Sequence, residues 1–510
     1  MIIMQIRRIL TLLFTATALF SCSDAWDEHS SRNKDVSNQT IYTYLQADPQ
    51  FSQFVALIDE VGYKEELTSS KQITVFALTN GAMEMVPSTF LADQSSKKTF
   101  VGHHITYGRN NLSNDANAGR IQMLSSKWLE VEQGLIDGLA VLSSSQALLN
   151  GFVNVMAEPV LPRLTIWEYV ENMAPQNKHV DYLNSLTRLT FSPDLSTQVG
   201  VNDLGQPVYD SVFIFRNSFN DNIADLSSED STLTLFIVED QVLNQEYQKF
   251  WRYYRVINGT TARDTAETKM RITRDYVFNE SYSPGNVPAM PVSANGIPVA
   301  FSDDAVVESF KASNGYVYVV SSAPVEVADR IRPIIVEGES PEAYYGLNTE
   351  RADAQGYLRI REHASGGHDF VLDNHIAGSS QRLTDGLILP AGFLPSIQYR
   401  VYWRAINDFR TSYRYPSDNE LRQRLGTSAV MTRDPVTGRV TRFAPPVYFT
   451  DFIPVTATEY SPNSEEDEVF VGTVNFGSMR NVYLQLVPEG VSTHHMAVTV
   501  DYIKLVPVLN

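Results

Sequence analysis

Apolar residues between positions 41 and 58 recur every three or four positions, as they do on the buried stripe of an amphipathic helix. Pro49, preceded by Asp48, interrupts the stripe, so the pattern predicts two short helices. The next apolar run, 73–77, is short and rich in β-branched residues, which favours a buried strand. Thr79-Asn80-Gly81 then supplies a turn and a polar cap for another helix. The helical stripe consists of Ile41, Tyr44, Leu45, Phe51, Phe54, Val55 and Ile58.

These landmarks occur twice, which indicates an internal repeat. The order of the landmarks is the same in both copies, and the second copy has about 35 extra residues between the first and second landmark. In each copy the last landmark is an Asn-Gly pair between apolar runs, typical of a hairpin turn that leads into a strand. The matching segments are 40–44 with 165–169, 73–76 with 233–236 and 150–153 with 314–317, at offsets of 125, 160 and 164 residues.

The first copy, residues 38–160, resembles the fasciclin domain. The resemblance rests on a Thr-Ile-Tyr-x-Tyr-Leu opening at 40–45, Thr-Val-Phe-Ala-x-Thr-Asn at 74–80, His103-His104-Ile105 and the closing Asn150-Gly151-x-Val153. Met83 departs from the Asn-x-Ala-Phe that is usual in this family. The resemblance implies a compact α/β wedge, a structural role for one histidine, and adhesion or ligand binding at a cell surface.

The second copy, residues 163–327, is a degenerate form of the same pattern. Phe236-Ile237-Val238-Glu239-Asp240 replaces the strand and turn, and no histidine pair precedes Asn314. Its resemblance to the fasciclin domain therefore rests on the order of the landmarks. We expect the extra residues, between about Asn172 and Leu233, to form an additional element.

The last third, residues 334–510, alternates apolar and polar residues over short stretches separated by turn residues. Stretches 399–404 and 498–505 show the alternation, which is typical of an all-β sandwich. The closing Val-Asp-Tyr-Ile-Lys-Leu-Val-Pro resembles the last strand of galactose-binding-like jelly rolls, which many carbohydrate-binding modules share. The predicted fold class is therefore multidomain, α+β and all-β: two fasciclin-like α/β wedges followed by a β-sandwich (jelly-roll) domain.

The N-terminus has the pattern of a bacterial lipoprotein signal. Arg7 and Arg8 precede an apolar run at 9–20, and Leu19-Phe20-Ser21-Cys22 resembles a lipid-attachment site, from which Phe20 departs. We expect a signal peptide at 1–21, a lipid on Cys22 and an acidic, polar tether at 22–37. The alternative is an ordinary secretory signal with a chance cysteine near its end.

Three carboxylates within six residues of Cys22, at Asp24, Asp27 and Glu28, resemble the tether of surface-exposed lipoproteins in gut Gram-negative bacteria. The expected location is the outer membrane, facing the cell exterior. With a formal net charge of −19, the chain repels phosphate backbones, which argues against nucleic acid as a partner. Its 43% hydrophobic residues are ample for several cores.

No catalytic, cofactor or metal motif is evident in the sequence. Cys22 is the one cysteine, so disulfides within the chain and thiolate sites are excluded. His103-His104 and His494-His495 are adjacent pairs that would point to opposite faces of a strand. The acidic runs at 303–304 and 465–468 are interpreted as solvated surface. A denser polar cluster, which is either a ligand loop or a mobile hairpin tip, contains Glu362, His363, His368 and Asp369.

Two aromatic clusters are candidate binding elements, because exposed rings stack on the apolar faces of sugars. Segment 250–255 carries four rings on consecutive helical positions, which cannot all face one core. We expect at least one of them to be exposed or to pack against a neighbouring domain, and favour the packing. The second cluster is the candidate ligand site of the sandwich, with core packing as the alternative, and comprises Tyr399, Tyr402, Trp403 and Tyr413.

The sequence therefore favours a non-catalytic, lipid-anchored surface protein that binds a ligand, with a glycan as the first choice. Resemblance to surface lipoproteins with fasciclin domains also implies a role as an accessory subunit of an outer-membrane nutrient importer and its lipoprotein lid. The alternative is an adhesin that binds matrix, host surface or neighbouring cells. A hydrolase within the sandwich is the third hypothesis.

The lipid anchor can be tested at Cys22. Because only this thiol can form the thioether, Cys22→Ala should release the protein from the membrane fraction or leave its signal uncleaved. Cell fractionation and the mass of the mature N-terminus measure both effects. A variant that remains processed and bound to the membrane would refute lipidation.

Overall fold

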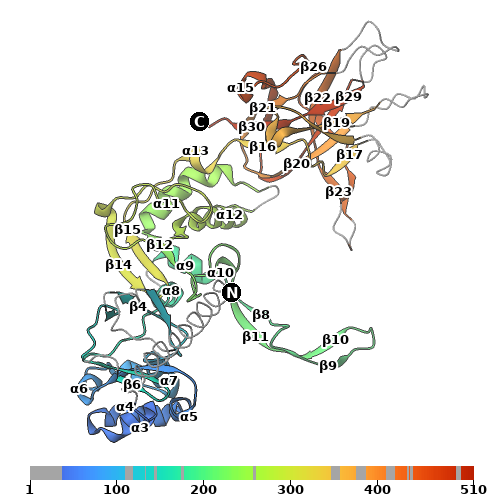
Figure 1. Ribbon diagram of the computed structural model, residues 1–510. Coiled ribbons are helices and arrows are strands. Elements are labelled where there is room, and N and C mark those ends of the chain that lie inside the picture. Colours follow the sequence, from blue (N-terminus) through green and yellow to red (C-terminus); the bar gives the residue numbers. More distant parts are fainter. Residues whose placement is uncertain are drawn as a thin grey trace, which may run out of the picture.

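The computed structural model comprises three units along the chain, each built around its own sheets (Figure 1). Cys22, Tyr413 and His494-His495 lie outside the residues described. Among the described helices, none is long and apolar enough to cross a bilayer. The structure describes residues 37–108, 119–132, 134–142, 146–173, 177–256, 260–345, 356–374, 386–408, 420–433, 436, 440–489 and 496–509.

The first unit opens with the two helices that the periodicity predicts. Helix α3 ends at Ala47, and the Asp48 side chain accepts a hydrogen bond from the Gln50 N–H at the start of a short 3₁₀ turn before α4. The predicted break at Asp48-Pro49 is therefore confirmed. The helices are α3 (Ile41–Ala47), η1 (Pro49–Phe51), α4 (Ser52–Val61), α5 (Lys64–Thr68), α6 (Asn80–Met83), η2 (Ser88–Leu91) and α7 (Gln94–Gly102).

The central sheet of this unit has the strand order β2-β1-β7-β6. Every residue of β1 is buried, which confirms the buried strand, and β1 runs parallel to β7 with Ile73 opposite Gly151. A smaller sheet has the order β3-β4-β5. The strands are β1 (Ile73–Leu78), β2 (Ile105–Tyr107), β3 (Gly119–Gln122), β4 (Trp128–Glu132), β5 (Leu135–Ile136), β6 (Gln146–Leu148) and β7 (Gly151–Met156).

The second unit repeats this topology. Its sheet has the order β13-β12-β15-β14, and β12 runs parallel to β15 with Leu233 opposite Gly315. The elements outside the inserted segment are α8 (Ile166–Met173), α9 (Lys178–Ser185), β12 (Leu233–Val238), α11 (Asp240–Phe250), η3 (Trp251–Tyr253), α12 (Thr261–Thr273), η4 (Arg274–Tyr276), β13 (Val277–Phe278), η5 (Asp303–Ala305), β14 (Val306–Ala312), β15 (Gly315–Val320) and α13 (Val327–Arg330).

One buried asparagine fastens the same three segments in both units. Asn150 Oδ1 accepts the Ile41 N–H of the opening helix at 2.9 Å, and its Nδ2 donates to the carbonyl oxygens of Leu67 and Ser69 at 2.9 and 3.0 Å. Asn314 makes the equivalent three bonds, to Ile166 N–H and to the carbonyls of Leu226 and Ser228, each at 2.9 Å. The Asn side chain therefore serves as a buried lock and not as a simple turn residue.

The glycine that follows each asparagine is required by the parallel strand pair. Gly151 has φ +148° and Gly315 has φ +144°, and a Cβ on either would lie within 2 Å of a carbonyl oxygen of the neighbouring strand, that of Ile73 or Leu233. Any side chain there would force the two central strands apart.

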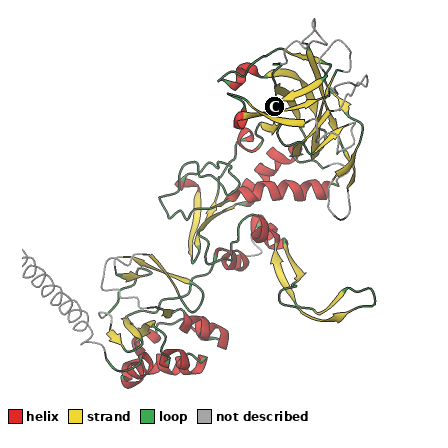
Figure 2. Cartoon of the chain, turned by 45° about the vertical axis from the view of Figure 1, so that its right-hand side comes forward, coloured by secondary structure: helices red, strands yellow, loops and turns green. Residues whose placement is uncertain are grey.

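The extra residues of the second unit form a long β arm that projects away from the body of the molecule (Figures 1 and 2). It consists of two successive two-stranded antiparallel ribbons, β8–β11 next to the body and β9–β10 at the far end. A short helix, α10, follows the arm. The elements are β8 (Thr187–Phe191), β9 (Thr197–Val201), β10 (Pro207–Asp210), β11 (Phe213–Asn217) and α10 (Ser218–Asn222).

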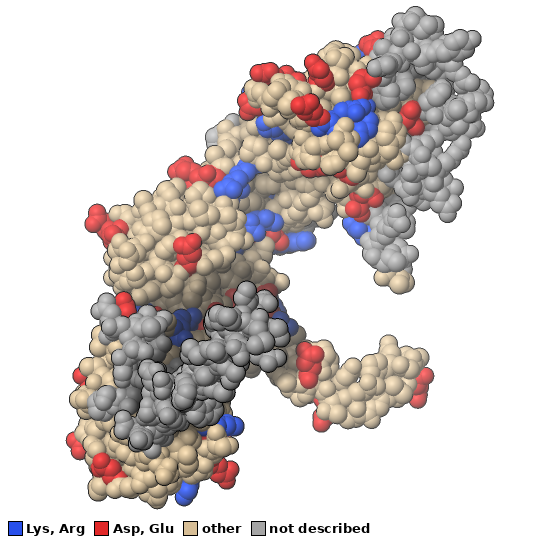
Figure 3. Space-filling view, in the orientation of Figure 1, with Lys and Arg blue, Asp and Glu red and all other residues tan. Residues whose placement is uncertain are grey.

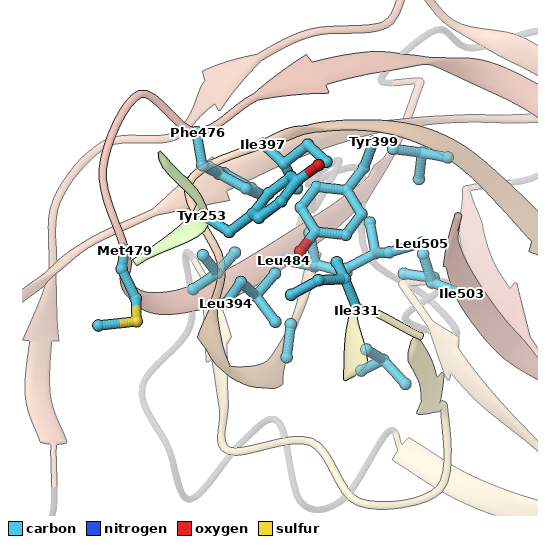
Figure 4. Close-up of a cluster of buried hydrophobic side chains, with 14 of the residues drawn as sticks. Tyr253, Ile331, Leu394, Ile397, Tyr399, Phe476, Met479, Leu484, Ile503 and Leu505 are labelled. Atoms are coloured by element: carbon cyan, nitrogen blue, oxygen red, sulfur yellow. The ribbon is translucent and has the colours of Figure 1, made fainter. Parts of the chain in front are cut away.

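Aromatic segment 250–255 joins the second unit to the C-terminal unit. Phe250, Tyr253 and Tyr254 are buried in one hydrophobic core that continues into the C-terminal strands, whereas Trp251 is 40% exposed. Figure 4 shows Tyr253 among Leu394, Ile397, Tyr399 and Phe476 of the C-terminal unit. The predicted packing between domains is thus confirmed.

The first and second units, in contrast, contact each other through charges. Lys127 lies 3.0 Å from Glu168 and 2.9 Å from Glu229, and Arg163 lies 3.0 Å from Asp137. The buried core of the first unit is a separate cluster.

The C-terminal unit consists mainly of antiparallel sheets, with orders β16-β30-β21-β27, β17-β20-β28-β22-β25, β18-β19-β29 and β23-β24, and β26 beside β22. The elements are β16 (Ile334–Glu337), β17 (Ala343–Tyr345), β18 (Gly356–Ile360), η6 (Ser365–Gly367), β19 (His368–Asp373), β20 (Gly386–Leu394), β21 (Gln398–Arg404), β22 (Leu421–Ser428), β23 (Val430–Arg433), β24 (Val440–Phe443), β25 (Val447–Tyr448), β26 (Ile453–Val455), α15 (Ser464–Asp467), β27 (Val469–Asn475), β28 (Arg480–Pro488), β29 (Ala497–Val500) and β30 (Tyr502–Pro507).

Stretch 498–505, which the alternation predicts as one strand, is divided at Asp501. Strand β29 pairs with β19 in one sheet and β30 pairs with β16 and β21 in another. Thr499 and Asp501 are both buried, so the polar positions of the stretch do not face solvent. The prediction of one continuous strand was wrong because Asp501 is held by a buried arginine, described below.

The asparagine lock predicts a large effect of a small substitution. Asn150→Ala removes three hydrogen bonds and leaves buried backbone groups unpaired, so the free energy of unfolding should fall by about 2–4 kcal/mol. Asn222→Ala, which removes one exposed bond to the Ser218 carbonyl, is the control and should change it by less than about 0.5 kcal/mol. Urea denaturation compares the two. Equal effects would show that the lock is unimportant.

Candidate functional site

The predicted ligand cluster of the C-terminal unit lies mostly in its core. Tyr399 and Trp403 are fully buried on β21, and the Tyr399 ring packs against Phe476 with centroids 5.8 Å apart. Because neither ring reaches solvent, the core alternative holds for both. As ligand-stacking residues they were wrong: Tyr399, Val401 and Trp403 share the face of β21 that packs into the core, whereas Gln398 and Arg400 on the opposite face are exposed.

Tyr402 is the remaining described member of that cluster. It is partly buried, and its ring meets the exposed Phe470 of β27 edge to face, with centroids 5.5 Å apart. Tyr413 lies outside the described residues. Tyr402 and Phe470 thus form an isolated pair of rings on the outer side of the sheet.

A pocket of about 400 Å³ lies elsewhere in this unit. Its walls come from the segment after β18, the segment after β21 and the segment before α15. Three of its lining residues carry carboxylates and one carries a guanidinium group. The lining residues are Arg361, Glu362, His363, Ile406, Asp408, Thr458, Glu459, Tyr460 and Pro462.

A network of ion pairs forms one side of this pocket. Asp408 accepts hydrogen bonds from the guanidinium groups of both Arg359 and Arg361. Arg359 also makes two bonds to the buried Asp369, at 2.6 and 2.9 Å, and the Tyr460 hydroxyl donates to the same carboxylate at 3.0 Å. These charge-assisted bonds hold the pocket wall in one geometry.

A second buried pair fastens the two loops at the mouth of the pocket. Arg404 donates to Asp501 at 2.8 Å, to the His363 carbonyl at 2.7 Å and to the Ser461 carbonyl at 2.8 Å. Asp501 in turn accepts the Ser365 N–H at 2.9 Å. Burial raises the pKa of Asp501 to about 6, against the opposing effects of Ser365 and Arg404. Because Arg404 and Asp501 contact both loops, the pocket is preorganised.

Tyr357 supplies an aromatic surface beside this network. It precedes Arg359 by two positions on β18, so these two side chains share one face of the strand, and Arg361 follows directly after the end of β18. The ring is 44% exposed. Burial of the remainder raises the pKa of Tyr357, and the nearby carboxylates of Asp373 and Asp408 raise it further. A partly exposed ring beside fixed donors and acceptors is suited to binding a polyhydroxylated ligand.

Half of the predicted polar cluster belongs to this pocket. Glu362 and His363 line it, Asp369 lies buried behind it as the partner of Arg359, and His368 bonds to the Gly366 carbonyl at the hairpin end. Sequence reasoning therefore found the region but missed Tyr357 and Asp408. The alternation Tyr357-x-Arg359-x-Arg361 was the available signal for the first.

The acidic runs differ from each other. Asp303 and Asp304 are exposed at a 3₁₀ turn, as interpreted. In the run 465–468, however, Asp467 lies 3.1 Å from Arg404 and Glu468 accepts bonds from Lys504 and Tyr502. Those two carboxylates are structural partners and are not merely solvated.

His103 and His104 lie at the end of α7 and not on a strand, and both are buried. His104 Nδ1 is 2.9 Å from the Phe100 carbonyl oxygen, and the Val160 N–H donates to His104 Nε2 at 3.2 Å. The ring is thus fixed as the neutral tautomer with its proton on Nδ1. Among the described residues no group of three or more His, Cys, Asp or Glu side chains is arranged to hold a metal ion.

Comparison with known families identifies one match, in the first unit. Residues 49–162 match the family model described as the fasciclin domain. The match begins at η1 and ends six residues after β7. No curated protein matches the chain.

Several solved structures are similar to parts of the chain. A fasciclin domain pair from the insect cell adhesion molecule Fasciclin I is 13% identical, with a TM-score of 0.22, and covers 55% of this chain and 99% of its own. A family 35 carbohydrate binding module from Clostridium thermocellum is 14% identical, with a TM-score of 0.20, over 35% of this chain and 99% of its own. An adhesin domain of Lys-gingipain from Porphyromonas gingivalis is 10% identical, with a TM-score of 0.19, over 35% and 99%.

The buried His104 predicts that the first unit is sensitive to acid. Burial lowers the pKa of His104 from its ordinary value of 6.5 to about 4. Between these values the unfolded chain binds more protons than the folded one, so stability falls as the pH falls, by on the order of 3 kcal/mol at pH 4. His104→Gln keeps an acceptor for Val160 without titrating, and its pH dependence should be correspondingly weaker. Urea melts from pH 4 to 7 measure the difference; parallel curves would refute the assignment.

Proposed function

We propose that this chain is a non-catalytic cell-surface lipoprotein that binds a glycan in the pocket beside Arg361 and Asp408. The observation that carries the proposal is the preorganisation of this pocket: its two loops are fastened by Arg404 and Asp501, and its wall is fastened by Arg359 and Asp369. A site that is ordered before binding loses little conformational entropy when its ligand arrives.

The side chains around the pocket match the chemistry of a sugar. Carboxylates at Glu362, Asp408 and Glu459 can accept bonds from hydroxyl groups, and Arg361 can donate to ring and hydroxyl oxygens. Tyr357 offers a ring face for axial C–H groups. Since the carboxylates outnumber the guanidinium group, a neutral glycan is favoured over a phosphorylated one.

The remainder of the chain supports presentation at a surface. The fasciclin domain at 49–162 follows the expected anchor at Cys22, and the second unit repeats its sheet order and asparagine lock, which supports a second fasciclin-like domain. In this arrangement the pocket lies in the unit farthest along the chain from the lipid. An accessory role beside an outer-membrane nutrient importer would use the pocket for capture, whereas an adhesin would use it for attachment.

Binding can be tested on residues 23–510 with a glycan array followed by calorimetry on the glycans that score. Arg361→Ala and Tyr357→Ala should each weaken binding by about tenfold or more, that is, about 1–3 kcal/mol. Both side chains are partly exposed, so the melting temperature should change little. Phe470→Ala is the matched control, because it removes an exposed ring of the same unit outside the pocket.

Three results would contradict the proposal. The first is unchanged affinity in both pocket variants. The second is an equal loss in Phe470→Ala, which would place the ligand on the Tyr402–Phe470 pair. The third is hydrolysis of the bound glycan, which would show that the protein is an enzyme.

A further inference from the structure

The arm formed by residues 187–217 has no packing partner for much of its apolar surface. Each of its ribbons contains two strands, and within the described residues no third strand pairs with either. Two-stranded ribbons are at best marginally stable in water unless a hydrophobic face is covered. Figure 2 shows the arm extending from the second unit with both long faces clear of the other described elements.

The ribbon next to the body has one apolar face. Leu189 lies opposite Phe215 and Phe191 lies opposite Phe213, so the register places all four side chains on the same side. Phe215 is 76% exposed, and Leu189 and Phe213 are also exposed. The far ribbon also exposes apolar side chains, and at its turn Leu204 is 83% exposed. Its other exposed apolar residues are Val199, Val201 and Val208.

Charge is distributed unevenly along the arm. At its base Arg188 lies directly opposite Arg216, a like-charge pair that destabilises an isolated ribbon. Arg216 lies 2.8 Å from Asp221, whereas Arg188 has no acidic partner among the described residues. The middle and outer part of the arm, 189–215, contains no Lys or Arg, and its charged residues are Asp194, Asp203 and Asp210. Figure 3 shows acidic side chains both along the arm and at its free end.

We propose that the arm is a dimerisation element, which pairs antiparallel with the arm of a second copy of this chain. In that arrangement the acidic end of each arm lies beside the basic base of the other, and the apolar side chains of both are covered. A two-fold axis generates both of these end-to-base contacts, because each copy contributes the same arm surface to the interface. Parallel pairing would instead place acid beside acid and base beside base.

The dimensions of the arm permit this pairing. Strands β8 and β9 have five residues each, which corresponds to about 16 Å per strand at about 3.3 Å per residue, and a turn at 193–195 lies between them. Two arms overlapping along these strands keep the bodies of the two copies apart. An anionic membrane surface is a poorer occupant, because the outer arm carries only negative charge.

Sedimentation velocity on residues 23–510, over a concentration series up to about 100 μM, tests the proposal. The wild-type chain should show reversible dimerisation. Phe213→Ser with Phe215→Ser should raise the dissociation constant at least about tenfold without lowering the melting temperature, since both rings are exposed in the single chain. Val307→Ser, at an exposed apolar position of β14, is the control and should dimerise normally.

A charge exchange distinguishes antiparallel arms from any other contact. One chain carries Arg188→Glu with Arg216→Glu, and a second carries Asp203→Arg with Asp210→Arg. Each alone should lose dimerisation, because like charges then meet at both ends of the pair. An equimolar mixture should recover it, because the acidic end and acidic base of the first variant then meet the basic base and basic end of the second.

A monomeric wild-type chain across the whole series would overturn the proposal, as would a dimer that persists when residues 190–214 are replaced by Asn-Gly between the cross-strand partners Leu189 and Phe215. Dimerisation that both charge variants lose and their mixture fails to recover would also overturn it, in favour of a different interface. Association of the wild type with anionic vesicles, in place of dimerisation, would assign the arm to the membrane.

Discussion

One hydrophobic core extends from the second unit into the C-terminal unit, and the arrangement of both depends on it. It contains Phe236 and Phe250 of the second unit, Tyr253 and Tyr254 of the segment that follows, and Trp403 of the C-terminal unit. If a ring that is buried between two units were separated from either unit, a large apolar area would be exposed to water. The segment from Phe250 to Tyr254 therefore acts as a plug that orients the C-terminal sheets. By contrast, the first unit has its own core and meets the second through ion pairs, which form a weaker constraint.

Buried arginines fix the positions of loops and side chains that apolar packing alone does not specify. Arg330 lies 2.7 Å from Asp275 and its guanidinium stands 4.0 Å from the Phe250 ring, next to the plug. Arg404 is the corresponding buried arginine of the C-terminal unit, where it contacts Asp501 and two loop carbonyls. A buried ion pair adds little net stability compared with an apolar replacement, but it requires specific partners at specific positions. In this chain the Arg404 pair constrains the loops that shape the pocket.

The parts of the fold that could be predicted are those whose signal is local. The break at Asp48-Pro49, the buried strand at 73–77 and the Asn-Gly landmarks follow from side-chain period and backbone freedom, which neighbouring residues decide. The pocket could be predicted only as a region. Glu362 and His363 stood out as polar residues near glycines, but Asp408 reaches them from a segment more than 40 residues away. No local pattern links those positions.

By itself, the sequence determined the two repeats, the helices and central strands of the first, and the need for the aromatic segment at 250–254 to pack against something beyond one core. Only the tertiary structure decided which rings are covered. The alternation shows that Tyr399 and Trp403 share one face of β21, but only the packing of the other core elements makes this the buried face, while Gln398 and Arg400 on the opposite face stay exposed. Asp501 reads as a polar break in an apolar strand, but a buried arginine 97 residues earlier makes it part of the core. Exposure is a property of the whole assembly of sheets, so it cannot be read from the period of one strand.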